Sequence, residues 1–183
     1  MPRTQMDWTA ERVRALPDDG KRYEVVDGEL LVTPSPRIPH QRALGELHFR
    51  LREYVRATGI GEVFFSPSDV EFDSRTLVQP DLFVVPLNEG RLLRDWSEIQ
   101  RLLLAVEILS PSTARYDRLT KRRVYQREGV EYWIVDIDAR VVERWRPGDG
   151  RPEILAERLE WQLHEGQVPW VLELEGYFDA VWG

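Results

Sequence analysis

Cysteine is absent from this sequence of 183 residues, which excludes disulfides and thiolate zinc sites and fits a reducing compartment. Long apolar runs are absent too: no stretch approaches the roughly 18 residues that a membrane helix needs. The first residues, Met1 to Gln5, have no apolar core of a signal peptide. We therefore expect a cytoplasmic protein without a membrane span. The length suits one domain, covering residues 1–183, that can bury a real core.

Lysine is nearly absent. Only Lys21 and Lys121 are lysines among 25 basic residues, and the other 23 are arginine. A chain with this bias keeps a lysine either by chance or where a compact ammonium cannot be exchanged for a guanidinium. Lys21 lies in a turn beside Asp18, so chance explains at least one of the two. The bias draws attention to Lys121.

The net charge of −7 argues against a protein that coats nucleic acid non-specifically. The charge is uneven, however, because residues 115–127 contain six basic side chains and one acid, a local balance of +5. One interpretation is a solvated helix face. The other is a phosphate-facing rim around a cleft, with Arg115, Arg118 and Arg122 as phosphate contacts.

The apolar periodicity and the turn signals predict an α/β protein with a central mixed sheet flanked by helices and an N-terminal β-hairpin. The expected elements are a short helix capped by Asp7 or Thr9, a hairpin of 23–26 and 29–32 with a type I′ turn at Asp27-Gly28, a helix over 40–58, two short strands within 61–72, a strand over 77–85 with an edge or a bulge at Pro80, a short helix over 95–100, a strand over 102–109, a helix capped by Ser112 and running to 128, strands over 131–136 and 140–146, and further strands with a terminal helix.

Glu107 is the most informative residue, because it lies in the aliphatic run 102–109, which reads as a central strand covered on both faces. An ionised carboxylate there is costly unless a cation or several hydrogen bonds compensate it. Asp81 and Lys121 are the candidate companions. A buried arginine as a purely structural partner of Glu107 is the alternative.

Two carboxylates without sulfur or imidazole ligands favour a hard cation such as Mg²⁺ or Mn²⁺. Lys121 shares one side of its predicted helix with Asp117 and Tyr125, at spacings of i, i+4 and i+8. An ammonium at that position could orient an attacking water or stabilise charge that builds on a phosphorane. A surface ion pair between Asp117 and Lys121 is the simpler alternative.

An ordered series of short motifs resembles the PD-(D/E)XK nuclease superfamily and, within it, the Uma-two family of restriction-endonuclease-like bacterial proteins. The motifs are Tyr23-Glu24-Val25-Val26-Asp27-Gly28-Glu29-Leu30, Ser35-Pro36 leading to His40, Gln79-Pro80-Asp81, Val106-Glu107-Ile108-Leu109-Ser110-Pro111-Ser112-Thr113, and Gly129-Val130-Glu131-Tyr132-Trp133.

The resemblance implies a restriction-endonuclease-like core in which Asp81 and Glu107 bind the metal. The lysine of the superfamily stands two positions after the glutamate, where this chain has Leu109. Some branches carry the lysine on the next helix, and Lys121 matches that arrangement. Glu29, His40 and Glu46 are candidate accessory groups, although His40 aligns with the apolar face of its helix.

The sequence therefore predicts a Mg²⁺- or Mn²⁺-dependent endonuclease that acts on DNA, with Asp81, Glu107 and Lys121 as catalytic residues. The alternative is a catalytically silent nuclease-like fold that binds nucleic acid or a partner protein. No H-E-x-x-H, G-x-x-x-x-G-K or G-x-S-x-G motif points to another chemistry. A homodimer would ease duplex cleavage, and tryptophans near the C-terminus, Trp161, Trp170 and Trp182, are candidates for its interface.

Overall fold

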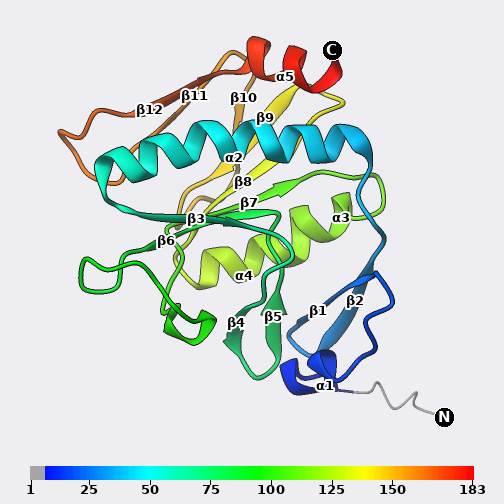
Figure 1. Ribbon diagram of the computed structural model, residues 1–183. Helices are drawn as coiled ribbons and strands as arrows, with labels where there is room; N and C mark the ends of the chain where they lie inside the picture. Colours follow the sequence, from blue (N-terminus) through cyan, green and yellow to red (C-terminus); the bar gives the residue numbers. More distant parts are fainter. Residues whose placement is uncertain (1–6) are drawn as a thin grey trace.

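The computed structural model describes residues 7–183 (Figure 1), so the expectation for Met1 to Gln5 lies outside the described residues. Its elements are α1 (Ala10–Arg14), β1 (Arg22–Val26), β2 (Glu29–Thr33), α2 (Ile38–Thr58), β3 (Gly61–Phe65), β4 (Val70–Asp73), β5 (Thr76–Val78), β6 (Leu82–Pro86), η1 (Trp96–Glu98), β7 (Leu104–Ile108), α3 (Ala114–Tyr116), η2 (Asp117–Lys121), α4 (Arg122–Arg127), β8 (Glu131–Asp136), β9 (Val141–Trp145), β10 (Glu153–Leu155), β11 (Arg158–Trp161), β12 (Trp170–Glu173) and α5 (Leu174–Trp182).

The central sheet has six strands in the order β10-β9-β8-β7-β6-β3. Strands β7 and β8 are parallel, and the other neighbours are antiparallel, so the predicted mixed sheet is confirmed. All five residues of β7 are buried, including Glu107. This strand is central, as its aliphatic sequence predicts.

Helices cover both faces of this sheet (Figure 1). Helix α2 lies across one face with α5 and the β11–β12 hairpin, and Leu47 and Leu51 pack there against Val106 in the larger core. The segment α3–η2–α4 covers the other face, where Val124 and Tyr125 pack in a second core. Glu107 lies on this second face because side chains alternate along β7.

Helix α2 has the boundaries that its sequence dictates. Pro39 stands in its first turn, where proline removes no helical hydrogen bond. Gly59 ends it with φ of 66°, a left-handed conformation that glycine adopts without steric cost. Its buried face begins with His40 at the end nearest the smaller sheet.

A second, four-stranded sheet in the order β2-β1-β5-β4 contains the N-terminal hairpin. Val26 pairs with Glu29 across a two-residue turn whose residues, Asp27 and Gly28, both have positive φ. The predicted hairpin and its register are therefore confirmed. Thr9 caps α1 by accepting a hydrogen bond from the backbone N–H of Arg12, as expected of one of its two candidate caps.

Two details of the predicted elements are wrong. The expected strand over 77–85 is two strands, because Pro80 separates β5 of the smaller sheet from β6 of the central sheet. Proline cannot donate a ladder hydrogen bond, so the chain changes sheet at this residue instead of forming an edge strand. The helix before β8 is preceded by Thr113 rather than capped by Ser112, and its middle turn, η2, is a π-helix.

The C-terminal tryptophans are mostly core residues. Trp161 and Trp170 are buried, and Trp133 stacks on Trp170 at 5.9 Å between ring centroids. Only Trp182 of the three is substantially exposed, at 46%. The expected tryptophan interface is therefore reduced to one residue. In the described part of the chain, every helix is too short or too polar to span a bilayer.

Candidate functional site

Asp81 lies where the chain enters the central sheet. The next residue, Leu82, pairs with Val106, so Asp81 stands across from Glu107 on the neighbouring strand. The side chain of Asp81 is buried, and both of its carboxylate oxygens have polar partners. Its Oδ1 accepts a hydrogen bond from the Arg22 guanidinium at 2.7 Å, and its Oδ2 accepts one from the backbone N–H of Ile108 at 2.8 Å and lies 3.1 Å from His40 Nε2.

Lys121 brings its ammonium to the other carboxylates. Its Nζ donates to Glu107 Oε1 at 2.8 Å, lies 2.9 Å from Glu24 Oε1 and is 4.0 Å from Asp117 Oδ1. All four side chains are at least 98% buried. Tyr125 adds a longer hydrogen bond to Glu107 at 3.3 Å. The surface ion pair considered for Asp117 and Lys121 is therefore wrong, because both lie in the interior.

The π-helical turn η2 contains both Asp117 and Lys121. Turns of this kind interrupt α-helices rarely and occur often at functional sites. Asp117, Lys121 and Tyr125 all face Glu107, as their spacing predicted. This helical segment thus places one acid, one ammonium and one phenol beside Glu107, on the face of β7 that the segment covers.

Glu24 connects this cluster to the smaller sheet. Its Oε1 accepts a hydrogen bond from the backbone N–H of Gln79 at 2.7 Å in addition to the Lys121 contact. Gln79 stands two residues before Asp81, so Glu24 fixes the segment that carries Asp81. The other oxygen, Oε2, is buried and has no hydrogen-bond partner among the described residues.

The surroundings shift the pKa values of the three remaining acids in different directions. Burial raises the pKa of Glu107 well above its usual range, although Lys121 acts against this shift. Burial likewise raises the pKa of Asp117 to about 6. Burial also disfavours the charged form of Asp81, but His40 and Arg22 outweigh it and hold the pKa of Asp81 below its usual range. The interior therefore compensates the ionised forms of Glu107 and Asp117 only in part and favours their protonated forms.

We call the six charged groups the buried charge cluster: Arg22, Glu24, Asp81, Glu107, Asp117 and Lys121. It contains four carboxyl groups and two permanent cations, which leaves two formal negative charges when all four acids ionise. Carboxylate oxygens and a surplus of −2 suit a divalent hard cation. Within residues 7–183, however, no three or more His, Asp or Glu side chains form a group that could hold a metal ion as they stand.

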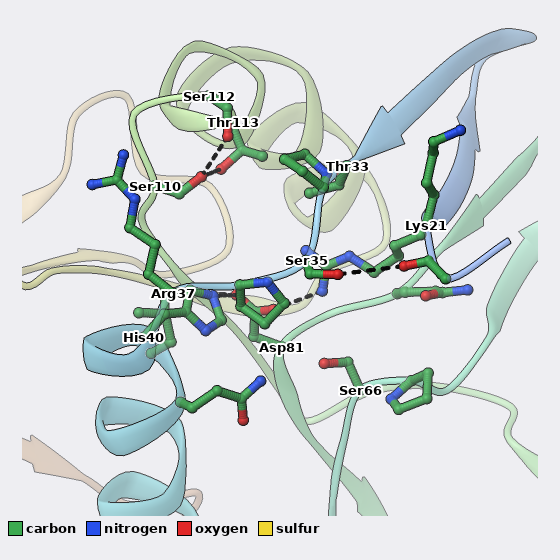
Figure 2. Close-up of a pocket in the computed structure, with 18 of the residues that line it drawn as sticks. Lys21, Thr33, Ser35, Arg37, His40, Ser66, Asp81, Ser110, Ser112 and Thr113 are labelled. Atoms are coloured by element: carbon green, nitrogen blue, oxygen red, sulfur yellow. Dashed lines mark hydrogen bonds and ion pairs between the residues drawn. The ribbon is translucent and has the colours of Figure 1, made fainter.

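A cavity of about 770 Å³ opens beside the cluster (Figure 2). Asp81, Arg22 and His40 line it, whereas Glu107 and Lys121 do not. Hydroxyl groups of Ser110 and Thr113, from the segment after β7, are hydrogen-bonded to each other at 2.9 Å and line it as well. A molecule in the cavity therefore meets Asp81 first, with Glu107 behind it.

The remaining predicted residues do not come together here. Glu29 is exposed on the hairpin, and Glu46 accepts hydrogen bonds from Arg50 on the surface of α2. Neither lines the cavity. His40, by contrast, joins the site: its ring is buried on the packed face of α2, as the alignment predicted, and its Nε2 still reaches Asp81.

The arginine-rich helix does not line the cavity. Arg118 is held by Asp136, at the end of β8, and by Glu143 of β9. Arg122 lies over the ring of Trp145 at 4.7 Å, and Arg115 is exposed. The phosphate-facing rim predicted for these residues is therefore not formed around this cavity.

Two residues of the site, Arg22 and Glu24, are not among those that the sequence predicts. Both stand on β1, two positions apart, so their side chains leave the strand on the same face. Glu24 is followed by Val25 and Val26, and an acid beside two aliphatic residues is the same signal that singled out Glu107. For Arg22, among 23 arginines, no sequence signal was available.

The chain was compared with known proteins. The model of the Uma2 family, described as "Putative restriction endonuclease", matches residues 10–180. A crystal structure described as a putative nuclease belonging to DUF820, from Anabaena variabilis ATCC 29413, is similar with a TM-score of 0.73 at 20% sequence identity. The match covers 95% of this chain and 99% of that one. At this identity the likeness establishes the shared fold. No curated protein matches the chain.

Proposed function

The chain belongs to the Uma2 family of restriction-endonuclease-like proteins, and we propose that it is a Mg²⁺- or Mn²⁺-dependent endonuclease that hydrolyses DNA phosphodiester bonds. Families of this kind generally use divalent metals. Residues 1–183 form the nuclease domain in this proposal, and two copies acting together would reach both strands of a duplex.

The observation that carries the proposal is the pairing of Glu107 with Lys121 at 2.8 Å, directly across the sheet from Asp81. Removing charged side chains from water is expensive, and a protein gains little stability from a buried ion pair compared with apolar residues of the same size. Four buried acids around two cations are therefore better explained by chemistry than by stability. Perturbed acids beside a cavity are typical of catalytic sites.

Asp81 and Glu107 would hold the metal, with Glu24 Oε2 as a further oxygen that is buried and without a partner among the described residues. Their oxygen donors and the charge surplus fit Mg²⁺ or Mn²⁺. When bound, such an ion polarises a phosphoryl oxygen and lowers the pKa of a coordinated water.

Lys121 acts in this proposal as a fixed positive charge. Burial alone would lower the pKa of Lys121, but Glu107, Glu24 and Asp117 together raise it, so the ammonium stays protonated at neutral pH. It does not line the cavity. Lys121 is therefore a positioning residue that orients the Glu107 carboxylate, and it is not a base.

His40 is the group best placed to handle a proton. Its Nε2 lies 3.1 Å from Asp81, its ring borders the cavity, and its Nδ1 is buried with no partner among the described residues. Histidine is the side chain most often used for general acid–base catalysis. The hydroxyl pair of Ser110 and Thr113 faces the same space and offers hydrogen bonds to phosphate oxygens.

A cleavage assay tests the proposal. The purified protein is incubated with single-stranded, duplex and branched DNA, and with RNA, in Mg²⁺, in Mn²⁺ and in EDTA. We expect metal-dependent cleavage of DNA and none in EDTA. Asp81→Asn should lower the rate by at least 100-fold. Equal cleavage by wild type and Asp81→Asn would contradict the proposal.

One observation favours the second candidate, a silent nuclease-like fold that binds nucleic acid or a protein. Arg22 and Lys121 already neutralise part of the acidic charge, and no preformed metal-ligand group exists among residues 7–183. This candidate predicts salt-sensitive binding of DNA without turnover in any of the metals.

A further inference from the structure

Arg22 is the one permanent cation that belongs to the buried charge cluster and also lines the cavity. Its guanidinium donates to Asp81 Oδ1 at 2.7 Å, and its side chain is 19% exposed, against 1% for Lys121. Arg22 therefore stands at the boundary between the buried acids and the space that a substrate would enter.

Arg22 interacts electrostatically with acids other than Asp81, its hydrogen-bond partner. Burial by itself lowers the pKa of Arg22, but the charges of Asp81, Glu107 and Glu24 raise it above its usual value. These are the same three carboxylates that the proposed function assigns to the divalent cation. The guanidinium thus already supplies part of the positive charge that these acids require.

Two cations cannot share one carboxylate oxygen at close range without repulsion, which is costly in a poorly screened interior. Asp81 Oδ2 is already occupied by Ile108 N–H and lies near His40, so Oδ1 is the oxygen that a metal would need. Arg22 holds that oxygen. Metal binding and the Arg22–Asp81 contact therefore compete.

The cavity of about 770 Å³ offers space for the displaced side chain, because Arg22 lines it. An arginine that turns into this space presents a planar pair of N–H donors, which match two oxygens of a phosphate group. Ser110 and Ser112 line the same cavity, and their hydroxyl groups are 3.0 Å apart.

We propose that Arg22 serves two states: it neutralises Asp81 in the metal-free protein, and it turns into the cavity to bind the phosphodiester of the nucleic-acid substrate when a divalent cation occupies the acids. This role rests on the proposed function. It makes Arg22 a residue that opposes metal binding and promotes substrate binding.

Removal of Arg22 should change the affinity for metal and the affinity for the duplex in opposite directions, which makes the test specific. We compare wild type with Arg22→Ala by calorimetric titration with Mn²⁺ alone, and by the binding of a fluorescent duplex oligonucleotide in Ca²⁺. The variant should bind Mn²⁺ about tenfold more tightly and the duplex about tenfold more weakly, which corresponds to about 1.4 kcal/mol in each case. Arg158→Ala, an exposed arginine of the β11–β12 hairpin, is the matched control and should change neither affinity.

Arg22→Ala leaves Asp81 buried without its cation, so the variant loses stability. Thermal unfolding with and without Mn²⁺ still measures Mn²⁺ binding in such a variant. Mn²⁺ should raise the Tm of Arg22→Ala more than that of wild type. Arg22→Lys, which keeps the charge without the planar donor pair, should bind Mn²⁺ like wild type and the duplex less tightly.

The outcomes separate the two ideas. If neither wild type nor Arg22→Ala binds Mn²⁺, the metal of the proposed function and the role of Arg22 both fail. If wild type binds Mn²⁺ and Arg22→Ala binds it equally or more weakly, only the role of Arg22 is overturned. Unchanged duplex affinity in Arg22→Ala overturns the phosphate contact.

Discussion

The ammonium of Lys121 donates a hydrogen bond of 2.8 Å to the Glu107 carboxylate, and both side chains are almost completely buried. The two residues come from different elements, the central strand β7 and the π-helical turn η2. Glu107 therefore does have the cation that its aliphatic surroundings require. The same ammonium also lies 2.9 Å from Glu24, so a single lysine is shared by two buried carboxylates.

The shared lysine predicts a large loss of stability on its removal. Lys121→Met keeps the length of the side chain but leaves Glu107 and Glu24 without their cation. We expect the free energy of unfolding to fall by about 3–5 kcal/mol, the range for breaking a buried ion pair. Urea denaturation monitored by tryptophan fluorescence measures the change.

The only other lysine of the chain provides the matched control. Lys21 lies on the surface and pairs with Asp19 at 2.7 Å. Lys21→Met should leave the free energy of unfolding close to that of wild type, because water screens an exposed ion pair. Similar losses in the two variants would contradict the distinction between the buried and the exposed lysine.

The pKa of Asp117 predicts a dependence of stability on pH. An aspartate titrates near 3.9 when unfolded, and burial raises the pKa of Asp117 to about 6 in the folded protein. The folded state therefore binds the proton more tightly. This contribution to stability is fully present below about pH 4 and is lost as the pH rises through about 6.

Asp117→Asn cannot ionise, so it should lack this loss. Relative to wild type, the variant should gain on the order of 2 kcal/mol in free energy of unfolding between pH 4 and pH 7. Denaturation at a series of pH values checks this, and Asp138→Asn, at an exposed turn, should parallel wild type throughout.

Glu24 predicts a link between the hairpin and the segment of Asp81. Glu24→Ala removes the acceptor of the Gln79 N–H and one partner of Lys121, both in the interior. We expect faster hydrogen exchange of the Gln79 amide and a loss of roughly 2–4 kcal/mol, because a buried donor is left unsatisfied. Glu46→Ala, on the surface of α2, should leave the Gln79 amide protected. Unchanged protection of the Gln79 amide in Glu24→Ala would contradict the role of Glu24 in fixing the segment that carries Asp81.

Local patterns were sufficient to predict most of the fold. Asp27 and Gly28 predict the hairpin because few residues adopt positive φ readily, and the aliphatic run around Glu107 predicts a central strand because only a strand covered on both faces requires it. The edge or bulge that Pro80 predicts within one strand is wrong, because β5 and β6 belong to different sheets. Sequence alone does not show that the chain leaves one sheet and enters another at that residue.

The candidate site was predictable in part, for a physical reason. An acid in an apolar strand requires compensation, which identifies Glu107 and points to Lys121. Which partner an acid takes depends on tertiary contacts between distant segments, and Arg22 reaches Asp81 across 59 positions. The local charge of residues 115–127 does not show which side chains line the cavity, because Arg118 contacts Glu143 and Arg122 lies over Trp145.

Glu107→Gln tests directly whether the Glu107 carboxylate is required for DNA cleavage, because it keeps the size of the side chain and removes only its negative charge. DNA cleavage is measured in Mg²⁺ and in Mn²⁺ for wild type and variant, with circular dichroism to establish that the variant is folded. We predict metal-dependent cleavage by wild type and a loss of at least 100-fold in the folded variant. Cleavage at the wild-type rate by folded Glu107→Gln would contradict this prediction.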